Sequence, residues 1–208
     1  MNYFILGSSG RENIICRKLN NENLYCISNF INPQIQLIVR NYYLVDNLDD
    51  SDLLFRKINE IILNKNIDFD KIIVILGSEN LLLHGLVDKL LKLGIHSISP
   101  IRELAKIETS KIFCREFMNY NNLGKYLPKY SIIYNYNNSE LSKLFNLYNN
   151  NFVLKKDGLH SGKGVSVFNE KNYLNAFDFC KDYFKGYLDS SNRKMLIEER
   201  LYGEEFSL

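Results

Sequence analysis

The sequence has few cysteines, and none of them form a C-x-x-C pair. The four thiols lie far apart in the chain, at Cys16, Cys26, Cys114 and Cys180. This spacing argues against the common zinc motifs and against a redox motif of the thioredoxin type. We therefore expect the cysteines to be small buried hydrophobic residues.

Long apolar segments and a secretory leader are also missing. The chain begins Met-Asn-Tyr-Phe-Ile-Leu-Gly, with no basic segment followed by a long apolar core, and no apolar run approaches transmembrane length. We expect a cytoplasmic protein that makes no contact with a membrane.

A strong excess of charge of either sign is missing as well. Lys and Arg total 26 and Asp and Glu total 24, which gives a net charge of +2. Nucleic-acid-binding domains commonly carry a clear basic excess, so we expect no nucleic-acid partner, and any basic site must be local. A hydrophobic fraction of 46% over 208 residues supports a sizeable core and favours two small domains.

Strand-like and helix-like segments alternate through the first half of the chain. Short apolar runs predict strands, and apolar residues at helical spacing predict helices. The expected order is strand 3–6, helix around 14–19, strand 24–27, helix 53–64, strand 71–76, helix 83–91 and strand 95–98. Alternation of this kind is typical of an α/β fold with an open, parallel, doubly wound sheet, which we expect over residues 1–102.

The pattern changes after Ser99-Pro100. A helix follows directly, and from about residue 131 the chain continues with strand, helix, strand, glycine-rich loop and strand. A helix from about Glu170 and a last strand at 195–199 complete the order. Residues 103–208 are therefore expected to form an α+β domain, distinct from the first.

The glycine-rich loop at 158–164 lies between two strand-like segments, with Lys155 just before it and Lys163 inside it. Glycines at 158, 162 and 164 let backbone N–H groups approach a phosphate. A P-loop is excluded, because only three residues separate the first two glycines and Gly164 stands where the hydroxyl residue belongs. A flap over nucleotide phosphates and an ordinary glycine-rich hairpin both remain open on this segment alone.

A second candidate anion site is the segment Gly7-Ser8-Ser9-Gly10, which follows the first strand and precedes a helix. Ser9 and Glu12 stand where a dinucleotide fingerprint requires glycines, so a dinucleotide is disfavoured. Glu79 follows the strand that ends at Leu76 and is expected to face the same crevice. A turn that serves packing alone, and a merely solvated glutamate, are the alternatives.

The end of the sequence carries two acidic pairs, at 198–199 and 204–205, on either side of a turn at Gly203. Carboxylates accept hydrogen bonds from ribose hydroxyls, and backbone groups at a strand edge can bind the amide-like edge of adenine. A charged hairpin tip is the alternative.

Five segments of the chain resemble, in order and rough spacing, the phosphoribosylamine–glycine ligases of the ATP-grasp superfamily. The resemblance covers nearly the whole chain. The segments are Gly-Ser-Ser-Gly-Arg-Glu-Asn at 7–13, Gly-Ser-Glu at 77–79, Glu-Thr-Ser-Lys-Ile-Phe at 108–113, Val-Leu-Lys-Lys-Asp-Gly-Leu-His-Ser-Gly-Lys-Gly-Val at 153–165 and Ile-Glu-Glu-Arg-Leu-Tyr-Gly-Glu-Glu at 197–205.

The resemblance implies a Rossmann-like pre-ATP-grasp domain over 1–102 and an incomplete ATP-grasp domain over 103–208. The second domain would hold a lid subdomain at about 126–192 and the start of a second lobe at 193–208. The implied reaction joins 5-phosphoribosylamine to glycine with ATP hydrolysis, through a glycyl phosphate, in purine biosynthesis.

The resemblance also implies roles for individual residues. Lys111 and Lys155 would meet the ATP phosphates, under a flap formed by Gly162, Lys163 and Gly164. Residues expected at the nucleoside are Glu198, Glu199 and Leu201 for adenine and Glu205 for ribose. Residues expected at the phosphorylated ribosylamine are Gly7, Ser8, Ser9, Gly10, Arg11 and Glu79. No residue is assigned to catalysis itself.

The sequence departs from the family at Asn13, where the family has histidine, and at Ser78, where it has proline; the family loop after the second strand is not reproduced at 29–33. The Mg²⁺ ligands and glycine-binding elements of the family lie beyond Leu208, so we expect a fragment that is inactive alone and is completed by another polypeptide or a longer product. A nucleotide- or ribophosphate-binding remnant without turnover, or another ATP-grasp carboxylate–amine ligase, are the alternatives.

Overall fold

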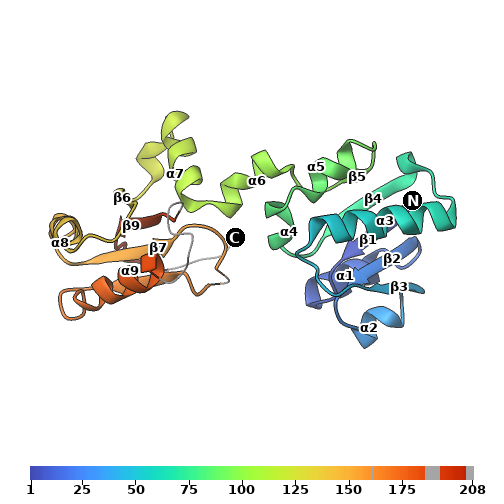
Figure 1. Ribbon diagram of the computed structural model, residues 1–208, viewed down its shortest axis with the longest axis horizontal. Coiled ribbons are helices and arrows are strands. Elements are labelled where there is room, and N and C mark those ends of the chain that lie inside the picture. The colour runs from blue at the N-terminus through green and yellow to red at the C-terminus, as the bar shows by residue number, and fades with distance from the viewer. Residues whose placement is uncertain (161, 186–192, 205–208) are drawn as a thin grey trace. The chain divides into compact units, whose positions relative to one another are not determined.

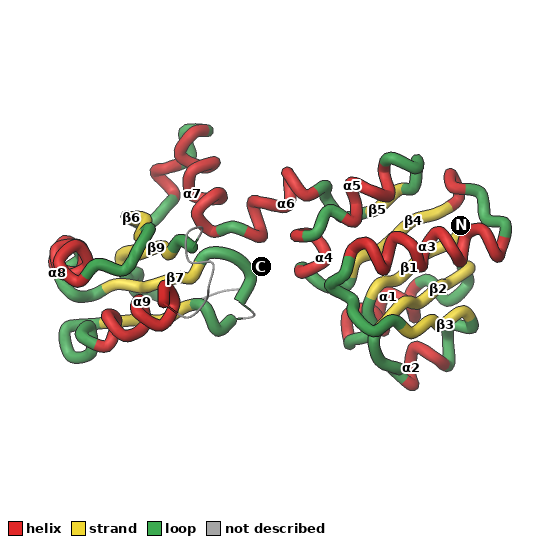
Figure 2. The backbone as a smooth tube through the Cα atoms, in the orientation of Figure 1, coloured by secondary structure: helices red, strands yellow, loops and turns green. Residues whose placement is uncertain are grey.

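The computed structural model describes residues 1–160, 162–185 and 193–204, and it divides the chain into two compact units, 1–109 and 110–208 (Figure 1). Each unit is described by itself. Strands of the first unit lie in one sheet and strands of the second unit in another (Figure 2).

The first unit holds a parallel sheet of five strands in the order β3-β2-β1-β4-β5. The strands are β1 (Asn2–Leu6), β2 (Asn23–Ser28), β3 (Asn41–Leu44), β4 (Ile72–Leu76) and β5 (His96–Ser97). The helices are α1 (Gly10–Lys18), α2 (Pro33–Gln36), α3 (Ser51–Lys65), α4 (Asn80–Leu83), α5 (Leu86–Leu91) and α6 (Arg102–Thr109), with a 3-10 turn at Phe69–Lys71.

Both faces of this sheet are covered, as the doubly wound prediction requires. Phe4 and Leu6 on one face of β1 pack in a cluster with Leu54 and Ile58 of α3. Ile5, which points the other way because side chains alternate along a strand, packs in a second cluster with Cys16 of α1. The predicted α/β fold of the first half is confirmed.

The second unit holds an antiparallel sheet in the order β6-β9-β7-β8. Its strands are β6 (Tyr130–Ile133), β7 (Phe152–Lys156), β8 (Val165–Phe168) and β9 (Met195–Glu199), and its helices are α7 (Lys111–Tyr120), α8 (Asn138–Leu147) and α9 (Asn175–Lys185), with a 3-10 turn at Gly124–Tyr126. Phe145 of α8 and Cys180 of α9 pack with Phe152 and Ile197 in one core, so both helices cover the same face of the sheet. Helix α7 contacts β9.

The structure corrects two local expectations and adds two elements. Helix α9 begins at Asn175 and not near Glu170, because Asn169 and Asn172 hold a turn in which Asn169 N donates to Asn172 Oδ1 at 2.7 Å. Strand β5 is limited to two residues. The short elements α2 and β3 lie in a segment for which no helix or strand was predicted.

The division between the units falls at 109/110, after α6, because α6 packs against α4. The sequence analysis placed a domain boundary at 102/103, and the assignment of functional domains and subdomains stays a prediction. Among the residues that the structure describes, no helix is both long and apolar enough to cross a membrane.

Glu12 of α1 is buried against the ends of β1 and β4, with 2% of its surface exposed. Gly77, which follows β4, is in such close contact with this side chain that a Cβ atom added there would lie 2.1 Å from Glu12 Oε1. Two well-packed segments therefore depend on the absence of a side chain at position 77.

We predict that Gly77→Ala destabilises the protein by about 1–3 kcal/mol, because the added methyl group overpacks this contact. Chemical denaturation measures the effect. Gly10→Ala is the matched control, since a Cβ there meets nothing within 4 Å, and it is expected to change stability by less than about 0.5 kcal/mol. Equal stability of Gly77→Ala and the wild type would contradict the steric account.

Three of the four cysteines are buried, as predicted, whereas Cys114 is half-buried. Burial raises the pKa of the Cys26 and Cys180 thiols to about 12 and that of Cys16 to about 11, with the charge of Glu12 contributing at Cys16. Three thiols are therefore protonated near neutral pH, and the nucleophilic thiolate is scarce.

We predict that a disulfide reagent at pH 8 labels Cys114 rapidly in the native protein and labels the other three thiols only after unfolding. Mass spectrometry of timed samples identifies the modified residue. A Cys114→Ser variant is the control and should lose the fast phase alone. Fast labelling of Cys26 or Cys180 in the native state would be inconsistent with their burial.

Candidate functional site

The loop between β1 and α1 is held in place by short polar contacts. Ser8 is 2% exposed, and its Oγ lies 2.5 Å from Ser28 Oγ and donates to Phe30 O at 3.1 Å. Ser9 N donates to Glu12 Oε2 at 2.5 Å. The first N–H groups of a helix have no intrahelical partners, so the start of α1 presents donors in a fixed frame.

Arg11 connects this loop to the end of β4. Its Nη1 donates to Gly77 O at 2.8 Å, and its Nη2 lies 3.3 Å from Glu79 Oε1. Arg11 and Glu79 are both largely exposed. The structure thus brings together two of the segments that the sequence assigned to one crevice, at the edge where parallel strands end.

The glycine-rich loop joins two antiparallel strands, β7 and β8, as the sequence analysis expected. Lys156 N donates to Gly164 O at 2.7 Å, which closes the loop at its base. Gly158 and Gly162 have φ values of +90° and +77°, a region that favours glycine over residues with a Cβ. Lys163 is exposed on this loop, and Ser161 lies outside the described residues.

The start of α7 is fastened to this loop through Asp157. The Asp157 carboxylate accepts hydrogen bonds from Ser110 Oγ at 3.0 Å and from Ile112 N at 3.2 Å. Lys111 Nζ donates to Gly158 O at 2.7 Å. A carboxylate at a helix N-terminus is favourable because it meets unpaired N–H groups and the positive end of the helix dipole. Lys111 is therefore fixed beside the loop.

His160 packs the loop from inside. Its Nε2 lies 2.8 Å from Asp157 O, and a Cβ added at Gly164 would lie 2.7 Å from His160 Cβ. The imidazole also meets the edge of the Tyr183 ring. Burial raises the pKa of Tyr183, and the charge of Asp157 adds to the shift, so this phenol stays neutral near pH 7.

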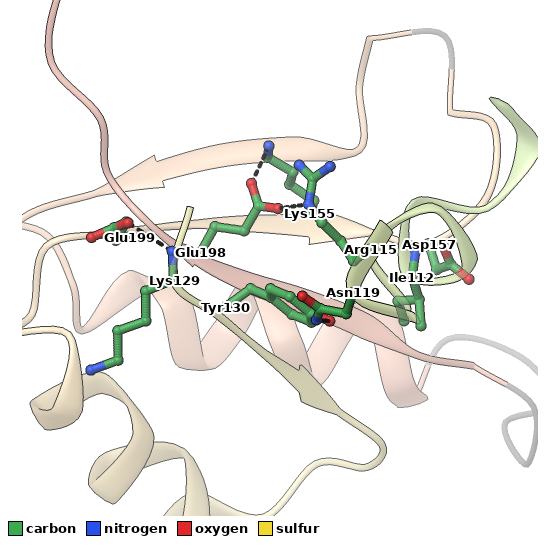
Figure 3. A network of polar contacts seen from close by, with 9 residues as sticks. All are labelled: Ile112, Arg115, Asn119, Lys129, Tyr130, Lys155, Asp157, Glu198 and Glu199. Carbon is green, nitrogen blue, oxygen red and sulfur yellow. Dashed lines mark hydrogen bonds and ion pairs between the residues drawn. The ribbon is translucent and has the colours of Figure 1, made fainter. Parts of the chain in front are cut away.

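Lys155 lies in a charge cluster on the sheet, together with Arg115 and Glu198, and Figure 3 shows the three side chains converging. Arg115 Nε lies 2.7 Å from Glu198 Oε1, and Lys155 Nζ pairs with Glu198 Oε2. The Glu198 side chain is 2% exposed, against 20% for Arg115 and 25% for Lys155. A buried carboxylate requires such partners, because its desolvation is costly.

Two further residues that the resemblance assigns to the nucleoside, Glu199 and Leu201, lie at the end of β9 and just after it. Glu199 is bound to the neighbouring chain, since its Oε1 accepts from Lys129 N at 2.7 Å and its N donates to Lys129 O at 2.9 Å (Figure 3). Leu201 is exposed. Glu205 lies outside the described residues.

Two residues of this arrangement were missed by sequence reasoning. Arg115 lies four residues after Lys111, a spacing that places both on one side of a helix, and that spacing was the available signal. Asp157 lies inside the quoted glycine motif, but nothing in the motif indicates that its partner is the start of a helix 45 residues earlier. In the described part of the chain, no three His, Cys, Asp or Glu side chains gather into a group that could hold a metal ion.

Curated relatives match the chain along its whole length. The phosphoribosylamine–glycine ligase of Methanobrevibacter smithii is 31% identical over 100% of this chain and 45% of its own length. The enzyme of that name from Pyrococcus horikoshii is also 31% identical, over 100% of this chain and 44% of its own length. The chain thus spans less than half the length of these relatives.

Solved structures share the fold. Phosphoribosylamine–glycine ligase from Thermotoga maritima has a TM-score of 0.65 at 21% identity and covers 98% of this chain and 45% of its own. N5-carboxyaminoimidazole synthetase from Staphylococcus aureus, solved as a complex with ADP, has a TM-score of 0.67 at 12% identity and covers 96% of this chain and 47% of its own. At these identities the likeness concerns the fold alone.

Two family models cover the chain in succession. The phosphoribosylglycinamide synthetase N domain matches residues 1–108, and the ATP-grasp (A) domain of the same family matches residues 109–208. The division between the two matches falls beside the division between the two compact units. The chain therefore belongs to the phosphoribosylglycinamide synthetase family and matches the models of its N domain and its ATP-grasp (A) domain.

Proposed function

We propose that this chain forms part of a phosphoribosylamine–glycine ligase. This enzyme joins 5-phosphoribosylamine and glycine with ATP hydrolysis. The products are glycinamide ribonucleotide, ADP and phosphate, and the reaction passes through a glycyl phosphate. The observation that carries the proposal is the succession of both family domains over residues 1–108 and 109–208. The reaction is that of the whole ligase, and the chain spans about 45% of its relatives' length. The remainder would come from a longer product or a complementing polypeptide, in the cytoplasm.

In this proposal the second unit binds the phosphates of ATP. Lys111 and Lys155 supply positive charge beside the glycine-rich loop, and Gly162, Lys163 and Gly164 cover the phosphates from above. The fixed position of Lys111 against Gly158 O and the open space at Gly162 support this role, whereas Gly164 packs against His160. Phosphoryl transfer depends on positioning and on neutralisation of charge, which lysines and backbone N–H groups provide.

The nucleoside would lie along the end of β9. Backbone groups of Glu198, Glu199 and Leu201 would contact adenine, and Glu205 would hold the ribose. The side chain of Glu199 already accepts a hydrogen bond from Lys129 N, and its backbone N–H already donates to Lys129 O, so adenine would have to meet other backbone groups of this segment.

The first unit would bind the phosphorylated ribosylamine. N–H groups at the start of α1 suit its phosphate, with those of Gly7 and Ser9 already donating to Ile27 O and Glu12 Oε2. Glu79 suits its ribose hydroxyls. The hydrogen bond from Arg11 to Gly77 O supports a single site built from both segments. Small molecules are the expected partners, with no nucleic acid or membrane.

Mg²⁺ bound with ATP would neutralise phosphate charge during transfer. The described residues offer no cluster of ligands that fits this ion, so we assign it to none of them.

A binding protein without turnover is the second candidate. Asn13 and Ser78 depart from the family residues in the two segments assigned to the ribosylamine. Such a protein would bind a nucleotide or a ribophosphate and would form no product.

We predict that the chain binds ADP and that Lys155→Ala weakens this affinity by about tenfold or more, because a charge-assisted contact to phosphate is lost. Isothermal titration measures the affinity. Glu198 keeps Arg115 as a partner in this variant, so we expect the fold to persist.

Lys156→Ala is the matched control for loss of a neighbouring charge, since Lys156 Nζ lies 4.8 Å from the centre of the Phe179 ring of α9. It is expected to change ADP affinity by less than about threefold. Absence of ADP binding to the wild-type chain at millimolar concentration would refute the proposed nucleotide site.

A further inference from the structure

The charge cluster of Lys155, Arg115 and Glu198 contains one more cation than anion. Glu198 is almost fully buried, whereas both cations are partly exposed. Each carboxylate oxygen has its own partner, Arg115 at Oε1 and Lys155 at Oε2. The cluster therefore carries a net positive charge, and its exposed part is cationic.

If Lys155 binds a nucleotide phosphate, that phosphate competes with Glu198 for the Lys155 ammonium group. Its ammonium group pairs with Glu198, and a phosphate would draw it away. A buried carboxylate left without a partner is strongly unfavourable, so Glu198 alone would retain Lys155 and oppose phosphate binding. Some other cation must hold Glu198 for Lys155 to be available.

Arg115 has the geometry for this task. It contacts Glu198 through Nε, and its two Nη atoms donate no hydrogen bond within the described part of the chain. It extends from α7, one turn after Lys111, and α7 is itself fastened to the loop by Asp157. The planar guanidinium group donates in fixed directions, so its contact with Glu198 does not depend on Lys155.

We propose that Arg115 is a positioning residue that holds the buried Glu198 carboxylate, so that Lys155 can turn to the nucleotide phosphates without leaving that carboxylate unpaired. This inference rests on the proposed nucleotide site. Arg115 then affects phosphate binding through Glu198 and Lys155, and it does not itself contact the phosphate.

The test is a double-mutant cycle on the 208-residue chain with ADP as the probe. Arg115→Met is expected to weaken ADP binding by about tenfold, because Lys155 becomes the only partner of Glu198. In a Glu198→Gln background no buried carboxylate retains Lys155, so the same Arg115→Met change is expected to cost less than about threefold. Arg115→Lys should restore most of the affinity.

Two measurements separate this action from simpler ones. Adenosine, which has no phosphate, should bind Arg115→Met and the wild type equally, and Lys156→Ala should again leave ADP affinity nearly unchanged. Thermal unfolding of each variant checks the fold. If Arg115→Met alone does not fold, the double variant with Glu198→Gln is compared with Glu198→Gln. The double variant is expected to fold, because it lacks both the buried charge and the cation that pairs with it.

Equal losses of ADP affinity on Arg115→Met in both backgrounds would overturn the inference, since they would indicate direct contact with phosphate. Unchanged ADP affinity in Arg115→Met would overturn it as well. In both cases the wild type still binds ADP, so the proposed nucleotide site stands. Failure of the wild type to bind ADP would instead refute that site, and this inference with it.

Discussion

The second unit depends on one constraint, the pairing of a carboxylate that the sheet buries. Glu198 is 2% exposed on β9, and it is matched by Arg115 from α7 and Lys155 from β7. The three residues come from separate elements, so the charge requirement joins the helix to both strands. The same pairing holds the side chain of Lys155, which the proposed nucleotide site assigns to phosphate, near the base of the glycine-rich loop.

The first unit also contains a buried carboxylate, that of Glu12. Glu12 and Glu198 are the buried carboxylates among the described residues, and each lies where a candidate ligand loop leaves a sheet. They are satisfied differently. Glu198 is held by two cations, whereas Glu12 accepts from Ser9 and presents its other oxygen, which has no hydrogen-bond partner among the described residues, to the Gly77 backbone. The first arrangement leaves a cation available for a ligand, and the second mainly fixes the loop.

Much of the fold could be predicted from the sequence, because apolar runs such as 72–76 and the glycine punctuation are local signals. The edge strand β3 and the start of α9 were not predicted, since half-buried tyrosines and asparagine turns carry no clear period. Candidate lysines were visible in motifs. Their partners were not, because Arg115 and Glu198 are 83 residues apart and meet only where α7 packs against β9.

In the proposed nucleotide site, Lys155 exchanges a buried carboxylate for a phosphate while Arg115 keeps that carboxylate paired. A crystal structure of the chain with ADP tests this most directly. We expect Lys155 Nζ within about 2.7–3.2 Å of a phosphate oxygen, with Arg115 Nε still bonded to Glu198. ADP bound with Lys155 still paired to Glu198 alone, or with the Arg115 guanidinium on the phosphate, would contradict it.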